Sequence, residues 1–366
     1  MAELEASVPA SPPPELTIHP MSFTGTGSEY FRIWIVNLAL TIVTLGVYSA
    51  WAKVRRLQYF YRHTQLAGSG FDYHGDPIAI LKGRIAGLML FGAYLAISYV
   101  RFSVALAIIG VLALLVPPLM ARALKFRLRN SSYRGIRFRF SGKDRSAYWV
   151  FLAMPFFTFL SLFTLGPLWH HRIKRYQVAN ATYGRSRFTF RAEVGEFYIA
   201  YVLAGAVFVA MVFAIMMVVV ATTFATLLAT RDSAPFDPNA PPGPAQWLAV
   251  VIVLVVYVPA VILVQSIIAA RVQNAVWNTT LLESHRFQYQ VSWFRLFGIQ
   301  FTNLLATMLT LGLFRPFAQV RLVRYVTGVF RLVPFGSLDT LGAAESEDVT
   351  AVGEEAIGFF DFDIGF

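Results

Sequence analysis

The chain has 366 residues, of which 57% are hydrophobic and 14% are charged, and its mean hydropathy is +0.57. Several charge-free runs approach the ~20 residues that a bilayer-spanning helix needs. A soluble protein cannot bury that many wholly apolar helices in one core, so the composition excludes a soluble fold and predicts a polytopic membrane protein. The chain contains no cysteine, which excludes disulfides and thiol chemistry.

Charged residues are distributed unevenly along the chain. Residues 1–20 are rich in proline and contain no lysine or arginine, unlike the basic start of a signal peptide, and are expected to form a disordered leader. All 31 Lys and Arg lie within 21–336 together with 9 of the 20 acids, a formal charge of +22. A basic core beside apolar helices favours anionic lipid headgroups as partners over nucleic acid.

Three apolar runs end in Thr-Leu-Gly and continue as a basic, aromatic segment. They read TLGVYSAWAKVRRLQYF at 44–60, TLGPLWHHRIKRYQV at 164–178 and TLGLFRPFAQVRLVRYV at 310–326. Alignment on the glycines Gly46, Gly166 and Gly312 brings into register Thr41, Ser161 and Thr307, and further on Arg55, Arg175 and Arg321. This agreement indicates an internal repeat of a short module.

Two longer apolar stretches, 85–124 and 197–270, separate the short modules, and each is typical of a pair of helices. The expected order is short, long, short, long, short, with modules at about 21–75, 76–142, 143–192, 193–291 and 292–336. Period-two alternation at 71–73, 138–140, 188–190 and 287–289 predicts short strands near the module boundaries. The expected fold class is an all-α polytopic membrane protein with small β-hairpins at its cytoplasmic surface, because strand edges cannot face lipid.

The topology of the short modules has two solutions. If each short module crosses the membrane once, the basic segments fall on both sides, against the tendency of Lys and Arg to remain cytoplasmic. If each turns back at Thr-Leu-Gly, all basic segments lie on one face, and glycine supplies the conformational freedom for the turn. We therefore favour re-entrant short modules, with full spans as the alternative, and expect the basic segments and both termini in the cytoplasm.

No catalytic or cofactor motif is recognisable in the sequence. There is no zinc-protease, serine-hydrolase or phosphate-loop signature, and the adjacent His170 and His171 point to different sides of a helix and make a poor metal site. No carboxylate lies within an apolar run, whereas proton-coupled transporters usually place one there. We expect a protein that is not an enzyme and has no metal or cofactor.

Polar residues at helical spacing form a stripe along the short modules. Spacings of three and seven place them on one helical face: Asn37, Thr41, Thr44, Ser161, Thr164, Asn303, Thr307 and Thr310. One interpretation is a polar lining for a solute or ion where broken helices meet. The other is interhelical hydrogen bonding, at about 0.6–2 kcal/mol per contact.

Basic residues after each Thr-Leu-Gly are candidate anchors for lipid headgroups, each adding about 1 kcal/mol of attraction to an anionic leaflet. They are Lys53, Arg55, Arg56, Lys174, Arg175, Arg321 and Arg324. Tyr48, Trp51, Tyr59 and Trp169 suit the aromatic belt at a membrane interface. The segment therefore predicts an interfacial position, with or without specific lipid binding.

The C-terminal segment, 337–366, contains eight acids and no base. Its last part, GEEAIGFFDFDIGF, alternates acids with large apolar residues, which a purely solvating tail does not need. It is expected to dock either on the basic face of this chain or on a protein partner.

The segments FTGTGSEYFRIWIVNLALTIVTLGVYSAWAKVRRLQYFY and GSGFDYHGDPIAILKGR resemble the YjgN-like family of bacterial inner-membrane proteins, a domain of unknown function. The resemblance covers about residues 20–336 and implies a multi-pass protein of the bacterial plasma membrane, without assigned catalytic or binding residues. Together the observations favour a transport-like or lipid-facing role. The alternative is a membrane scaffold or regulator that recruits a partner through its hairpins and tail; the oligomeric state is left open.

Overall fold

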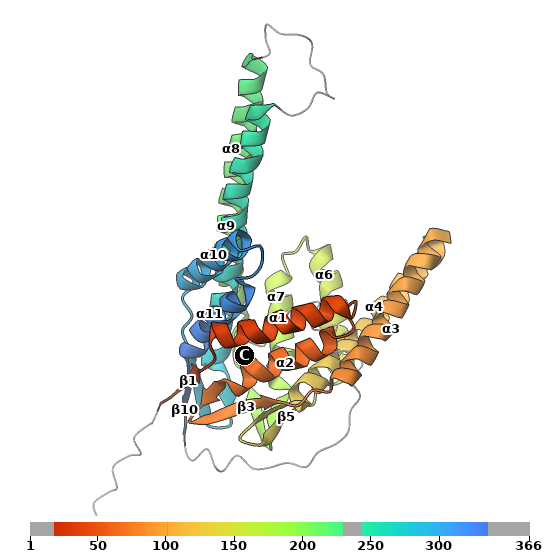
Figure 1. Cartoon of the computed structure of the whole chain (residues 1–366), viewed down its shortest axis with the longest axis vertical. Coiled ribbons are helices and arrows are strands. Elements are labelled where there is room, and N and C mark those ends of the chain that lie inside the picture. Colours follow the sequence, from red (N-terminus) through yellow and green to blue (C-terminus); the bar gives the residue numbers. More distant parts are fainter. Residues whose placement is uncertain (1–17, 101, 230–242, 336–366) are drawn as a thin grey trace, which may run out of the picture.

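A closed antiparallel β-barrel forms the base of the molecule, and helical hairpins project from it on one side (Figure 1). The computed structural model describes residues 18–100, 102–229 and 243–335. The predicted leader up to residue 17 and the predicted tail lie outside the described residues. The same holds for most of the loop at 231–244.

The repeating unit is a strand, a helical hairpin and a second strand. The two long hairpins are α3 (Pro77–Val100) with α4 (Phe102–Arg129), and α8 (Val194–Ala229) with α9 (Pro244–Thr279). The three short hairpins are α1 (Gly27–Val43) with α2 (Ser49–Arg62), then α5 (Asp144–Tyr148), η1 (Trp149–Ala153) and α6 (Met154–Leu160) with α7 (Gly166–Ala179), and α10 (Trp293–Leu309) with α11 (Arg315–Gly328).

Each hairpin leaves the barrel from a leading strand and rejoins it in a return strand. The leading strands are β1 (His19–Phe23), β3 (Ser69–Tyr73), β5 (Ile136–Phe140), β7 (Ser186–Thr189) and β9 (His285–Tyr289). The return strands are β2 (Thr64–Leu66), β4 (Ser131–Tyr133), β6 (Ala181–Tyr183), β8 (Leu281–Leu282) and β10 (Phe330–Val333). Neighbouring strands pair antiparallel all the way round, and β1 pairs with β10 to close the barrel.

The strand register repeats in all five units. The third residue of each leading strand lies opposite an inward-facing residue of the return strand, in the pairs Met21–Leu66, Phe71–Tyr133, Phe138–Tyr183, Phe188–Leu282 and Phe287–Leu332. Aromatic rings therefore fill the barrel, with centroids 4.7 Å apart for Phe71 and Tyr133 and 5.1 Å for Phe138 and Tyr183. The barrel is a packed core, as expected when side chains occupy the interior of a small barrel.

The all-α fold class expected from the sequence is wrong. The alternating segments are not separate surface hairpins, because they join with the return strands into the closed barrel. Return strands have only two to four residues, too few for period-two alternation to be recognised. Closure also pairs His19 with Leu332, a contact between distant parts of the chain that no local pattern encodes.

Buried tyrosines tie the barrel together. The hydroxyl of Tyr133 donates to the Leu66 carbonyl oxygen at 2.7 Å, and that of Tyr183 donates to the Tyr133 carbonyl oxygen at 3.0 Å. Burial raises the pKa of Tyr183 to about 12, so this phenol keeps its proton and remains a donor. Each bond reaches from one unit to the preceding one and thus couples the units.

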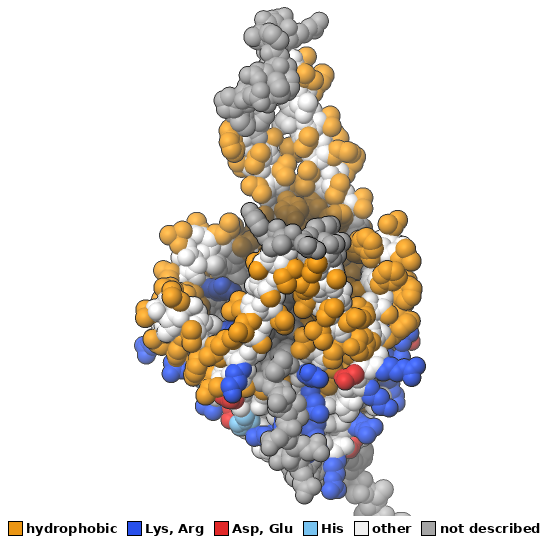
Figure 2. All heavy atoms as spheres, turned by 90° about the vertical axis from the view of Figure 1, so that its right-hand side faces the viewer, with side chains coloured by type: hydrophobic (Ala, Val, Ile, Leu, Met, Phe, Trp, Pro, Cys, Tyr) orange, Lys and Arg blue, Asp and Glu red, His pale blue; other side chains and the backbone are white. Residues whose placement is uncertain are grey.

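The helical part has the length and the apolar surface that a lipid bilayer requires. Among the described residues four helical segments are long and apolar enough to cross a membrane: Pro77–Ser98, Ala107–Arg129, Val194–Leu228 and Trp247–Thr279. Figure 2 shows hydrophobic side chains over the helical part of one face and Lys and Arg gathered below them, toward the barrel. Both ends of every hairpin meet the barrel, so the barrel and the basic helix ends lie on one side of the apolar layer.

Candidate functional site

Thr44 and Thr310 organise the turns at the first and third Thr-Leu-Gly. The Thr44 hydroxyl donates to the Leu40 carbonyl oxygen at 2.7 Å and accepts from the Tyr48 N–H at 2.9 Å, and Thr310 makes the same pair of bonds with Ala306 and Phe314. The following residues take positive φ, including 93° at Gly46, which glycine adopts without steric cost. In these two hairpins the hydroxyl therefore ties the end of the first helix to the N-cap residue of the second, Tyr48 or Phe314; we call this the capping position.

The second copy of the turn is shifted by three residues relative to the alignment on glycines. The N–H of Phe163 donates to the Thr158 carbonyl oxygen at 2.8 Å, as Gly46 does to Thr41 and Gly312 to Thr307. Ser161 accordingly holds the capping position, accepting from the Leu165 N–H at 3.2 Å. The equivalence of Ser161 with Thr41 was wrong. Ser161 corresponds to Thr44, and the buried Thr158 corresponds to Thr41.

The same shift changes the arginine alignment. Counted from the capping position, the counterpart of Arg55 and Arg321 is Arg172, and not Arg175. Arg175 corresponds instead to Gln58. The shift arises because Leu162 and Phe163 both adopt positive φ, at 51° and 65°, in place of a glycine, so the glycine of the second copy lies inside α7 and outside the turn.

The predicted polar stripe lies along the first helix and the turn of each short hairpin, and its hydroxyls bond to their own helices. Thr41 and Thr307 donate to the carbonyl oxygens of Asn37 and Asn303, both at 2.6 Å, while Thr164 is exposed and donates to Ser161 at 2.8 Å. This back-bonding satisfies the hydroxyls locally. It leaves the two buried asparagines as the stripe's remaining polar groups.

The predicted anchors occupy different environments. Arg55, Arg56 and Arg175 are exposed, and the Arg55 guanidinium carbon lies 5.6 Å from the centroid of the Tyr48 ring. Lys53 is half-buried, whereas Lys174 is only 6% exposed and lies within the helical layer.

In the third short hairpin, Arg321 and Arg324 are exposed but bonded to the chain. Arg321 Nη1 donates to Thr302 Oγ1 at 2.8 Å, and Arg324 Nη2 donates to the Gly25 carbonyl oxygen at 2.9 Å. Arg324 therefore joins the last unit to the first, next to the strand pair that closes the barrel.

Two grooves between the helices of the short hairpins combine arginines with an apolar wall. The first has a volume of about 500 Å³ and is lined by Arg32, Ile33, Val36, Arg55, Gln58, Tyr59, Arg62 and His63. The second has a volume of about 970 Å³ and contains Arg145, Arg172 and Arg175 beside Trp149, Phe156 and Phe157. Guanidinium groups suit phosphate oxygens, and the rings suit apolar chains.

The grooves are equivalent by the internal repeat. Each of the eight residues lining the first groove has a counterpart lining the second at a constant shift of 117 positions, among them Arg55 with Arg172 and Tyr59 with Tyr176. Four of the groove arginines were not among the residues predicted from the sequence: Arg32, Arg62, Arg145 and Arg172. The signal that finds Arg172 is the capping pattern, since it restores the correct register in the second copy.

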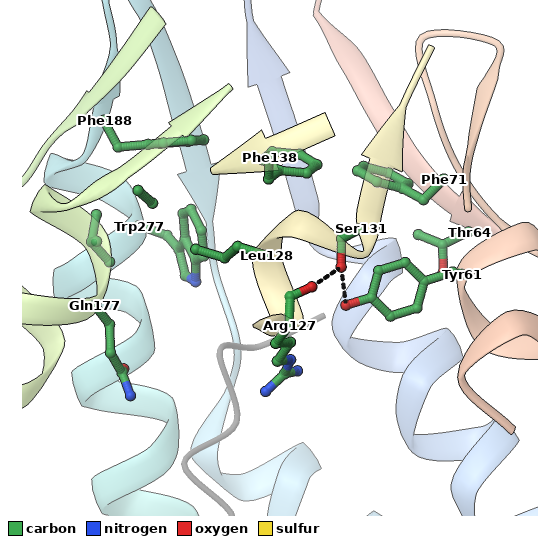
Figure 3. A pocket seen from close by; sticks show the side chains of 12 residues that line it. Tyr61, Thr64, Phe71, Arg127, Leu128, Ser131, Phe138, Gln177, Phe188 and Trp277 are labelled. Atoms are coloured by element: carbon green, nitrogen blue, oxygen red, sulfur yellow. Dashed lines mark hydrogen bonds between the residues drawn. The ribbon is translucent and has the colours of Figure 1, made fainter. Parts of the chain in front are cut away.

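A separate cavity of about 80 Å³ lies at the mouth of the barrel, where helix ends from several units converge. Figure 3 shows Phe71, Phe138, Phe188 and Trp277 around it, with Arg127 and Gln177 extending away from the rings. The Ser131 hydroxyl donates to the Arg127 carbonyl oxygen at 2.9 Å and lies within hydrogen-bond distance of the Tyr61 hydroxyl, at 3.3 Å. In the part of the chain that the structure describes, no cluster of three or more metal-ligating side chains occurs.

Four helices long and apolar enough to cross a membrane, among the described residues, indicate a multi-pass membrane protein. The chain belongs to the family described as "Bacterial protein of unknown function (DUF898)", which it matches over residues 18–359.

Curated relatives carry the name inner membrane protein YjgN, so the resemblance seen in the sequence is confirmed. The relative from Salmonella typhimurium is 30% identical over 149 residues, covering 40% of this chain and 37% of that protein. The relative from Escherichia coli K12 is 32% identical over 143 residues, covering 37% of this chain and 35% of that protein. The matched segment thus spans little more than a third of these relatives. No solved structure matches the chain.

Proposed function

We propose that this protein binds anionic phospholipids of the cytoplasmic leaflet in the two equivalent grooves of its short hairpins. The observation that supports this most directly is the recurrence of one groove at equivalent positions in two units, where Arg55 and Arg172 occupy the same position beside an apolar wall. A phospholipid has the matching chemistry, since a phosphate can accept from guanidinium groups while acyl chains pack against aromatic rings.

Exposed apolar turns support the same proposal. Leu45 and Leu311 are each 95% exposed and Leu162 is 84% exposed at the tips of the three short hairpins. Side chains of this kind would be costly in water and stable in the acyl layer. A hairpin that dips into the leaflet from the barrel side would place Arg62 and Arg145, at the barrel ends of their helices, at headgroup depth. The long side chains of the mid-helix Arg55 and Arg172 can extend toward the same level.

The transport-like alternative has less support. It depends on a polar lining along the stripe, yet the hydroxyls of Thr41, Thr44, Thr307 and Thr310 bond to carbonyls of their own helices. Their protons are therefore not available to donate to a solute, and the oxygens of Thr44 and Thr310 also accept from backbone N–H groups. The scaffold alternative depends on the tail, which lies outside the described residues.

The test compares two pairs of arginines with equal loss of charge. Arg172→Gln with Arg175→Gln removes two groove arginines, while Arg137→Gln with Arg139→Gln removes two exposed arginines of strand β5. The purified proteins are titrated with phosphatidylglycerol and, separately, phosphatidylcholine, and bound lipid is counted by native mass spectrometry.

We expect the groove variant to bind phosphatidylglycerol roughly tenfold to thirtyfold more weakly, at about 1 kcal/mol per arginine, and the barrel variant to bind as wild type. Equal weakening in both variants would indicate general charge attraction. Equal binding of the two lipids by wild type would exclude recognition of the anionic headgroup.

A further inference from the structure

The cavity at the barrel mouth has two chemically different ends. Its inner wall is made by rings of Phe71, Phe138, Phe188 and Trp277, and its outer side carries Arg127 and Gln177 (Figure 3). A space of about 80 Å³ suits one apolar side chain and excludes a lipid tail. An aromatic wall next to an arginine fits a peptide in which an apolar residue is followed or preceded by an acidic one.

Gln177 indicates that a polar ligand completes this site. The residue is only 4% exposed, and its Oε1 atom has no hydrogen-bond partner among the described residues. A buried acceptor left unpaired costs about 1–3 kcal/mol. A backbone N–H of an extended peptide laid across the mouth would satisfy it.

The charge around the mouth favours an acidic peptide. Arg127 and Arg129 end helix α4, and the buried Lys174 lies one turn before Gln177 on α7. The segment 353–366 of this chain, GEEAIGFFDFDIGF, alternates acids with Phe and Ile and contains no base. The match to the family also continues beyond the barrel to residue 359, so part of this segment belongs to the family's shared sequence.

The chain is long enough to reach the mouth. The described part ends at Phe335, whose N–H donates to His285 Nδ1 at 3.2 Å at the end of the barrel far from the helices. Residues 336–366 can extend over roughly 100 Å, whereas a five-residue strand rises only about 17 Å. The segment is therefore long enough to extend from the far end of the barrel to the mouth at the helix side.

We propose that the C-terminal segment 353–366 docks in cis at the barrel mouth, with an aromatic side chain in the cavity and an aspartate against Arg127. The docked peptide covers the aromatic rings and supplies the missing donor to Gln177. This site is separate from the lipid grooves, so its test is independent of the proposed lipid binding.

The experiment uses disulfide capture in the full chain, which has no native cysteine. Leu128→Cys places a thiol on the cavity wall, and a second cysteine replaces Phe360, Phe362 or Ile364 in turn. A specific protease site inserted after Ala344 releases the tail unless a disulfide retains it. Arg187→Cys, on the exposed face of strand β7, is the control position.

We expect at least one tail position to be retained with Leu128→Cys at fivefold or greater yield over Arg187→Cys, and to be released by reductant. Arg127→Glu should lower the yield, and adding Asp361→Lys and Asp363→Lys should restore it. Release of the tail at all three positions overturns the proposal. So does capture only between two different copies, seen when singly substituted chains are mixed, because the occupant is then a second molecule.

A second measurement leaves the body of the protein unchanged. A photo-crosslinking residue at Phe362 should label peptides that contain Tyr61, Leu128 or Val178. Labelling confined to the outer barrel strands would overturn the proposal even if Leu128→Cys fails to fold.

Discussion

Arg321 donates from Nη1 to the side-chain oxygen of Asn303 at 3.2 Å, bridging helices α10 and α11. The counterpart in the first hairpin differs: Arg55 lies over the Tyr48 ring, and the side-chain oxygen of the buried Asn37 has no hydrogen-bond partner among the described residues. Equivalent asparagines in two copies of one hairpin thus have unequal bonding.

This inequality predicts unequal mutational effects. Asn303→Leu removes the bond from Arg321 and the bond from Nδ2 to the Ala318 carbonyl oxygen, and should destabilise the protein by about 1–3 kcal/mol. Asn37→Leu removes an unpaired acceptor and should be neutral or stabilising. Thermal unfolding of both variants in the same detergent distinguishes them. Equal losses would show that the two hairpins are bonded alike.

The shifted turn makes a second pair of variants informative. Gly46→Ala and Gly312→Ala force a side chain into φ of 93° and 94°, and each should cost about 1–2 kcal/mol. Gly166 has ordinary helical φ, and no atom lies within 4 Å of an added Cβ, so Gly166→Ala should not destabilise. Alignment on the glycines instead predicts that all three variants lose the same amount of stability. Measured unfolding temperatures decide between the two alignments.

Hydrogen bonds inside the barrel should be measurable one at a time. Tyr183→Phe and Tyr133→Phe each remove a hydroxyl that donates to the preceding unit, and each should cost about 0.5–1.5 kcal/mol. Tyr148→Phe is the matched control, because Tyr148 is exposed on the second short hairpin. The free energy of unfolding in denaturant gives all three values. No loss at Tyr183 would mean that water replaces the bond.

His285 makes barrel stability dependent on pH. Burial lowers the pKa of this histidine, partly opposed by Glu283, so the folded state resists a proton that the unfolded state accepts below its ordinary pKa of about 6.5. Stability should therefore be full above that pH and fall as the pH drops below it, by at most about 1.4 kcal/mol per pH unit.

The comparison variant for that prediction is His285→Asn, which keeps an acceptor for the Phe335 N–H and cannot titrate. Its unfolding temperature should depend less on pH than that of wild type between pH 6.5 and the lowered folded pKa. Parallel curves for the two proteins would show that other groups cause the dependence.

Local patterns in the sequence predicted the organisation of the helices. Uninterrupted apolar runs identified the long hairpins, because spanning length is set by bilayer thickness. The leading strands at 71–73 and 138–140 were visible from period-two alternation, and β3 and β5 include them. The candidate site was found only in part: Arg55 and Arg175 line grooves, while Arg172 was missed because Phe163 replaces glycine at the turn.

The sequence by itself determined a multi-pass membrane protein of a recognisable bacterial family with an internal helical repeat, since hydrophobicity and repeated motifs are local properties. Only the tertiary structure decided that the strands form one closed barrel and that arginines from both helices of a short hairpin share a groove. The physical reason is that barrel closure depends on pairing between residues far apart in the chain, such as His19 with Leu332, and that a groove forms only where two helices bring residues such as Arg32 and Arg55 to one space.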